Sequence, residues 1–221
     1  MFGRIAPRYD LLNHLLSGGL DILWRRKAAR LLAPRPGERL LDLCSGTGDL
    51  ALAIAGQAGG AVRLTAADFT FEMLALGRRK FEGKARIPEA GADGLCLPFG
   101  SGTFDGVTAA FGVRNFEDHR KGFREIFRVL RPGGRLVVLE FTPEPTGFLS
   151  PLVRLHLRHV LPRLGKLLSG DAAAYRYLPN TIERWPDPVE LAGRLREAGF
   201  REVAIAPLSF GVAAIHVARK A

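Results

Sequence analysis

Three acidic residues stand near the ends of predicted strands, and a glycine-rich turn follows the first of them. Asp42 precedes the run Gly46-Thr47-Gly48, Asp68 follows the second apolar strand directly, and Asp93 lies beyond the third. Glycines allow a sharp turn and a close approach of the backbone to a ligand. The carboxylates can hold three parts of one nucleoside: Asp42 an ammonium, Asp68 two ribose hydroxyls, and Asp93 an adenine amino group. This pattern predicts a nucleoside-binding site.

The spacing of the glycines alone fits more than one ligand class. The two glycines and Ala51, with an acid about 20 residues further on, also match the dinucleotide fingerprint. A carboxylate at Asp42 would repel a pyrophosphate, whereas it suits the α-ammonium of S-adenosylmethionine. Short-chain dehydrogenases also need a lysine four residues after a tyrosine, and none of the three tyrosines has one. We therefore predict S-adenosylmethionine as cofactor, although each acid alone can also be a helix cap and the turn can exist without a ligand. The predicted cofactor-binding residues are Asp42, Gly46, Thr47, Gly48, Asp68, Asp93, Gly94 and Ala110.

Apolar strands and short helices alternate over the stretch that contains these residues. Such alternation predicts βαβ units and an α/β fold with a mostly parallel sheet, whose ligands bind beyond the carboxyl ends of the strands. A further helix and two late strands are expected near the C-terminus. The predicted strands are 39–43, 62–67, 86–92, 104–111, 135–141, 201–207 and 212–219, and the predicted helices are 49–58, 72–81, 119–130 and 188–198.

Two more helical segments are expected outside this alternation. Residues 5–33 carry leucines at helical spacing around a Ser-Gly-Gly break, and we interpret 1–33 as an N-terminal lid. Residues 148–168 carry a leucine stripe and basic but no acidic residues, which suits either an anionic membrane surface or a buried core helix. The chain 1–221 is then a single domain, with a cofactor-binding half at 34–142 and a substrate-side half at 143–221.

Composition narrows the class of protein. The chain has 221 residues, of which 47% are hydrophobic and 24% are charged, so disordered and fibrous classes are excluded. Two cysteines are too few for a disulfide scaffold, the five histidines form no ligand cluster, and we predict no metal. The net charge of +10 is scattered without an aromatic-interleaved patch, which argues against nucleic acid as a partner. The sequence shows no apolar signal region, and we expect a cytoplasmic location.

The motifs together resemble a known family. Asp42, the glycine turn, Asp68 and the run Arg128–Gly134 resemble class I S-adenosylmethionine-dependent methyltransferases, which implies a Rossmann-like sheet of seven strands with helices on both faces. More specifically, the chain resembles the ubiquinone/menaquinone biosynthesis C-methyltransferase family over nearly its whole length. The segments that carry this resemblance are Ile5–Asn13, Phe111–Asn115, Leu139–Phe141 and Tyr175–Leu178.

Three features depart from the family pattern. Thr70 stands where the family usually has an asparagine, and Thr181 stands where a serine is common. The chain also starts at Met1, where relatives usually carry some preceding residues, so part of a lid is expected to be missing or dispensable. None of the departures falls on the acids predicted to bind the cofactor.

The resemblance implies C-methylation of a polyprenylated quinol ring, with demethylmenaquinol to menaquinol as the foremost reaction. A sulfonium methyl is already activated, so the chemistry needs no metal. A ring carbon attacks it only when the ring is electron-rich, and the substrate is therefore the quinol. The lipophilic substrate fits a peripheral contact with the inner face of the membrane, and an oligomer is compatible with the sequence.

The resemblance and the strand ends also suggest catalytic residues. Arg114 and Asn115 follow the fourth strand, Tyr9 lies in the lid, and Tyr177 lies in the late loop. Arginine is a poor base because its pKa exceeds about 12, so we expect Arg114 to stabilise a developing phenolate while Asn115 orients a hydroxyl or water. A structural pair between Arg114 and Glu140 is the alternative. Two other functions stay open: methylation of another small molecule, and binding of S-adenosylmethionine without catalysis.

Overall fold

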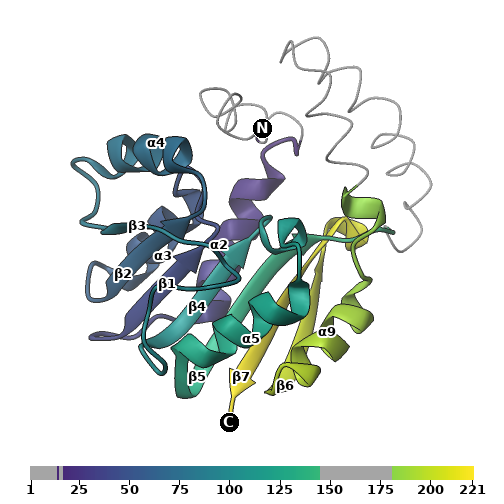
Figure 1. The fold of residues 1–221 in the computed structure, drawn as a ribbon. Helices are drawn as coiled ribbons and strands as arrows, with labels where there is room; N and C mark the ends of the chain where they lie inside the picture. Colours follow the sequence, from purple (N-terminus) through teal and green to yellow (C-terminus); the bar gives the residue numbers. More distant parts are fainter. Residues whose placement is uncertain (1–13, 15–16, 145–180) are drawn as a thin grey trace.

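A seven-stranded sheet organises the computed structural model, which describes residues 14, 17–144 and 181–221. The strand order is β3-β2-β1-β4-β5-β7-β6. All neighbouring strands are parallel except at β7, which runs antiparallel to β5 and β6 (Figure 1). The strands are β1 (Arg39–Leu43), β2 (Arg63–Asp68), β3 (Glu89–Gly91), β4 (Phe104–Ala110), β5 (Leu130–Phe141), β6 (Phe200–Leu208) and β7 (Ala213–Lys220). The predicted α/β class with seven mostly parallel strands is confirmed.

Helices cover both faces of this sheet, as Figure 1 shows. On one face, α5 and α9 contribute buried residues such as Phe123, Ile126 and Leu191. On the other face, α2 and α3 contribute Trp24 and Ile54. The helices are α2 (Leu20–Leu32), α3 (Asp49–Ala58), α4 (Phe71–Phe81), α5 (His119–Val129) and α9 (Pro188–Glu197), with 3₁₀ turns η1 (Val113–Asn115) and η3 (Ser209–Gly211). The central strands β1, β4 and β5 are buried over most of their length because each side of the sheet faces a helical layer there.

The sequence-based boundaries differ from the structure mainly at two strands. The third strand covers 89–91 rather than 86–92, since Pro88 has no N–H to donate to the ladder. The fifth strand begins at Leu130 rather than at 135, because Leu130 pairs with Phe104 before a register shift. The strand ends that matter for the predicted site are unaffected by either difference.

Helix α2 belongs to the core rather than lying over it. Its residues Trp24, Ala28 and Leu32 recur at helical spacing and are 5% exposed or less. The indole Nε1 of Trp24 also donates a 2.9 Å hydrogen bond to Ser209 Oγ. The second half of the segment interpreted as a lid is thus a packed layer beside α3, while residues 1–13 lie outside the described residues.

The switch in strand order falls between β1 and β4. Chain order runs outward from β1 through β2 and β3 on one side, and through β4 and β5 on the other. Ligands of open α/β sheets bind beyond the carboxyl ends of the strands at such a point. Asp42, Asp68 and Ala110 lie at or near the carboxyl ends of β1, β2 and β4, so all three are at this edge of the sheet.

Candidate functional site

The turn after β1 is built from two glycines with different roles. Gly48 has φ +85°, and a Cβ at this position would lie 2.3 Å from the Phe81 ring. Gly46 has φ +55°, yet a Cβ there would meet no atom within 4 Å. Gly48 is therefore required by backbone conformation and packing, whereas Gly46 leaves open space beside the backbone. That space allows a ligand to approach the turn closely.

The Asp68 carboxylate accepts hydrogen bonds from two backbone amides, one in the glycine turn and one directly after β2. Its Oδ2 accepts a 2.8 Å hydrogen bond from the Gly46 amide, and its Oδ1 accepts one of 2.8 Å from the Thr70 amide. A carboxylate has about four lone-pair sites, so both oxygens can still accept hydroxyl hydrogens. Thr70, which stands in place of the expected asparagine, takes part through its backbone.

Asp42 is a buried carboxyl with one unpaired oxygen. Its side chain lies in β1 with the residue 1% exposed, and Oδ1 accepts a 2.7 Å hydrogen bond from Thr108 Oγ1. Oδ2 has no hydrogen-bond partner among the described residues. Burial raises the pKa of Asp42 to about 7. A buried carboxylate without a full set of partners is unfavourable, and a cationic ammonium would supply what is missing.

Asp93 and Gly94 form a loop after β3. Asp93 Oδ1 accepts a 2.8 Å hydrogen bond from the Leu95 amide, and Asp93 forms an isolated bridge with Cys96. A Cβ on Gly94 would lie 2.4 Å from the Phe116 ring, so only glycine fits beneath that ring. The carboxylate is thus oriented by its own loop, as in a simple turn, and keeps an oxygen for another donor.

Thr47 and Lys80 connect the glycine turn to α4. Lys80 Nζ lies 3.1 Å from Thr47 Oγ1 and 2.6 Å from Asp49 Oδ1. Thr47 itself is 3% exposed. Sequence reasoning missed Lys80, as it missed Thr108, because each contact joins residues more than thirty positions apart. Lys80 holds the turn in place from the neighbouring helix.

The Arg114 side chain forms the ion pair that the sequence left as an alternative. Arg114 Nη1 donates hydrogen bonds of 2.6 Å to Glu140 Oε1 and to the Phe111 carbonyl oxygen. The two side chains are 5% and 1% exposed, and burial raises the pKa of Glu140 although Arg114 opposes the rise. Arg114 Nε and Glu140 Oε2 have no partner within the described part of the chain. The pair therefore retains bonding capacity at the ends of β4 and β5.

The backbone around this pair is strained. Phe111 has φ +56° and Cys44 has φ +55°, both in the left-handed region that favours glycine. A Cβ on Gly112 would lie 2.2 Å from Cys44 Cβ, so the loops after β1 and β4 touch there. Ala110 ends β4 directly before Phe111, and Asn115 ends the 3₁₀ turn η1. Strained residues of this kind gather at functional sites.

Some of the predicted residues lie outside the part of the chain that the structure describes. They are Tyr9 and Tyr177, together with the segments 148–168 and 175–178. His119 begins α5, where its ring stacks edge-on against Trp185 at 4.9 Å between centroids. The described residues contain no group of three or more histidine, cysteine, aspartate or glutamate side chains suited to a metal. No helix in that same part of the chain is long and apolar enough to cross a membrane.

Comparison with known proteins finds methyltransferases both among sequence relatives and among solved structures. The demethylmenaquinone methyltransferase of Thermus thermophilus is 52% identical over 218 residues, which is 98% of each chain. The demethylmenaquinone methyltransferase of Deinococcus radiodurans is 46% identical, covering all of this chain and 91% of the relative. A solved S-adenosylmethionine-dependent methyltransferase from Aquifex aeolicus has a TM-score of 0.66 at 17% identity over 89% of each chain, which shows a shared fold. The model of the ubiE/COQ5 methyltransferase family matches residues 1–220, and the chain belongs to that family.

Proposed function

We propose that this methyltransferase transfers the methyl group of S-adenosylmethionine to a ring carbon of demethylmenaquinol, giving menaquinol. The observation that carries the cofactor assignment is the buried Asp42 carboxyl with its unpaired oxygen beside an open glycine turn. The two relatives named for demethylmenaquinone support the choice of ring over a benzoquinol.

Each part of the site has a distinct proposed role in holding the cofactor. Asp42 binds the α-ammonium, Asp68 accepts hydrogen bonds from the ribose hydroxyls, and Asp93 accepts one from the adenine amino group. Backbone groups of the glycine turn and of the segments that end β4 and follow β3 contribute beside them. The residues proposed to contribute such close backbone contacts are Gly46, Thr47, Gly48, Gly94 and Ala110.

When bound, S-adenosylmethionine supplies a methyl group activated by a sulfonium. In the transfer a carbon–carbon bond forms at the ring, the carbon–sulfur bond breaks, and the ring carbon loses its proton. The quinol hydroxyl gives up its proton as negative charge builds on the oxygen, and the oxygen regains a proton when the ring carbon loses its own, so that one proton is released overall. The proposed role of Arg114 is to stabilise that charge, with Glu140 fixing the guanidinium. Asn115, Tyr9 and Tyr177 are proposed to orient the hydroxyl or a water.

Deletion of the gene tests the choice of substrate. Quinones extracted from cells that lack the protein should contain the unmethylated naphthoquinone in place of its methylated form. The same cells supplied with the intact gene on a plasmid are the control, and they should recover the methylated quinone. Accumulation of an unmethylated benzoquinone would shift the assignment to the other ring. An unchanged quinone profile would favour another small molecule as substrate.

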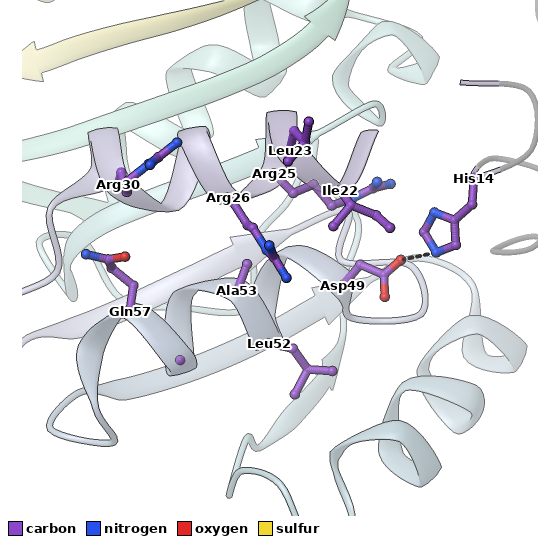
Figure 2. A pocket seen from close by; sticks show the side chains of 11 residues that line it. His14, Ile22, Leu23, Arg25, Arg26, Arg30, Asp49, Leu52, Ala53 and Gln57 are labelled. Atoms are coloured by element: carbon purple, nitrogen blue, oxygen red, sulfur yellow. Dashed lines mark ion pairs between the residues drawn. The ribbon is translucent and has the colours of Figure 1, made fainter. Parts of the chain in front are cut away.

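We also propose a peripheral contact with an anionic membrane surface, because the substrate carries a lipid tail. The acid-free segment 148–168 is one part of the proposed contact. A second part is suggested by α2, where Ile22 and Leu23 are 40% and 56% exposed. They line a cavity of about 670 Å³ between α2 and α3 together with Arg26 and Arg30 (Figure 2). Exposed apolar groups beside arginines suit a lipid surface of negative charge.

Vesicle sedimentation tests this contact. Binding should rise with the anionic lipid content of the vesicles and fall with salt. The double variant Arg26→Glu, Arg30→Glu should bind less, whereas Arg63→Glu, Arg201→Glu makes the same change in net charge at exposed sites elsewhere and should bind more nearly as the wild type does. Equal loss in both variants would indicate a response to net charge alone, and no binding of the wild type at low salt would exclude the contact.

A further inference from the structure

We propose that Arg25 binds the α-carboxylate of S-adenosylmethionine, completing with Asp42 a pair of opposite charges for the amino-acid end of the cofactor. This inference rests on the proposed function, because it names a recognition residue within the same site. Neither the sequence motifs nor the glycine turn indicates Arg25. It comes from α2, whereas Asp68 ends β2 and Asp93 follows β3.

Arg25 reaches the strand ends from the helical layer. Its guanidinium carbon lies 5.2 Å from the centroid of the Phe111 ring, and Phe111 directly follows β4. The side chain is 11% exposed. Burial raises the pKa of Asp42, and the charge of Arg25 is near enough to oppose that rise. Arg25 therefore lies close to the Asp42 carboxyl and beside the loop that follows β4.

The donors of Arg25 are mostly unused. A guanidinium has five N–H donors, and among the described residues Arg25 makes one hydrogen-bond contact, from Nη1 to Asp21 Oδ2. The guanidinium carbon lies over the Phe111 ring, and the remaining N–H donors can bind a carboxylate, which arginine can hold through two parallel hydrogen bonds. The α-ammonium and α-carboxylate share one carbon, so a ligand whose ammonium is at Asp42 presents its carboxylate nearby.

Asp21 is a positioning residue for Arg25. The carboxylate is 3% exposed and accepts hydrogen bonds from Ser17 Oγ at 2.7 Å and from His14 Nδ1 at 2.8 Å when that nitrogen carries a proton. Burial works to raise the pKa of Asp21, yet Ser17 and Arg25 together hold it below its ordinary value. An ionised, immobilised carboxylate fixes the guanidinium without using all of its donors.

The other basic residues near the turn are less suited to this role. Lys80 contacts Thr47 and Asp49, and Arg114 is paired with Glu140. Arg26 leaves α2 in a different direction from Arg25, towards α3 (Figure 2), and its side chain is exposed. Arg26 is therefore a matched control of the same residue type on the same helix.

Calorimetry with two ligands isolates the carboxylate. S-adenosylmethionine and decarboxylated S-adenosylmethionine are titrated into the wild type, Arg25→Ala, Arg25→Lys and Arg26→Ala. The wild type should bind the decarboxylated ligand at least tenfold more weakly, as expected for loss of a charge-assisted hydrogen bond. Arg25→Ala should weaken binding of S-adenosylmethionine by a similar factor and change binding of the decarboxylated ligand far less. Arg25→Lys should recover part of the difference, and Arg26→Ala should match the wild type.

Three results would overturn the assignment. Equal binding of both ligands by the wild type would show that nothing recognises the carboxylate, a result that needs no variant. If the Arg25 variants keep the wild-type preference for S-adenosylmethionine over the decarboxylated ligand, another residue recognises the carboxylate. Equal loss for both ligands would give Arg25 a structural role only. A wild type that binds neither ligand contradicts the proposed function itself, which distinguishes the two failures.

Discussion

Cofactor binding should release a proton from Asp42. The folded protein without cofactor holds this carboxyl at a pKa of about 7, whereas the ordinary value is 3.8. An ammonium beside the carboxylate favours the ionised form, so a protonated Asp42 must lose its proton when the ligand binds. At pH 6 about nine tenths of the carboxyl is protonated and at pH 8 about one tenth, from the titration of a single group with this pKa.

The same shift predicts how stability depends on pH. The folded state binds the Asp42 proton more tightly than the unfolded chain does, so protonation stabilises the fold. This contribution to the free energy of unfolding is complete below about pH 4 and is lost as the pH rises through 7. A difference of about three pKa units corresponds to roughly 4 kcal/mol of unfolding free energy, at 1.36 kcal/mol per unit. Asp42→Asn cannot ionise and should lack this loss between pH 5 and pH 8.

The assay is calorimetric titration of S-adenosylhomocysteine, which keeps the α-ammonium, in buffers of different ionisation enthalpy. Near pH 6 the wild type should release close to one proton per ligand, and the release should fall towards zero as the pH approaches 8. The comparison stays at or below pH 7.5, where the α-amino group of the ligand is protonated. Asp42→Asn is the control and should release none of this proton while binding more weakly. Equal proton release in both proteins, or none in the wild type, would refute the role of Asp42.

Three further predictions follow from the same geometry. Asp68→Ala removes the acceptor proposed for two ribose hydroxyls and should weaken S-adenosylhomocysteine binding by about 1.5–3 kcal/mol in calorimetry, and unchanged affinity would remove this carboxylate from the site. Gly48→Ala drives a Cβ into the Phe81 ring and should lower the free energy of unfolding in a denaturant titration by about 1–3 kcal/mol, whereas Gly46→Ala should cost less; equal costs would contradict the packing argument. Arg114→Lys keeps a charge beside Glu140 but loses the guanidinium, so kcat should fall on the order of 10²–10³ with little change in cofactor affinity, and normal turnover would place charge stabilisation elsewhere.

The fold could be predicted from the sequence because the patterns that indicate its strands and helices are local. Strands such as 39–43 and 104–111 are short apolar runs bounded by turn residues, and their alternation with helices predicts a parallel sheet. A parallel sheet places the ends of β1 and β2 at one edge, so Asp42 and Asp68 could be assigned to one site before any contact was known. The largest boundary differences arise where Pro88 and the pairing of Leu130 override the apolar pattern, and the other boundaries differ by about one residue.

The electrostatic environment of the site could not be predicted in the same way. Thr108 bonds to Asp42 across 66 positions, and Lys80 reaches Thr47 across 33. No periodic pattern encodes such contacts, since each depends on which strands and helices become neighbours. The same is true of Arg25, whose run of basic residues in α2 is typical of a solvated helix face. Only the packing of α2 beside the sheet brings its guanidinium over Phe111.

The most direct test of the proposed reaction is transfer of a labelled methyl group. The purified protein is mixed with S-adenosylmethionine carrying a deuterated methyl and with demethylmenaquinol kept reduced, and the product is examined by mass spectrometry. The expected product is menaquinol with the whole deuterated methyl on the ring carbon, together with one S-adenosylhomocysteine for each menaquinol formed. The oxidised quinone should give no product, because its ring carbon is not nucleophilic. Label on a ring oxygen, or no transfer to the quinol by protein that binds the cofactor, would contradict C-methylation of the quinol by this protein.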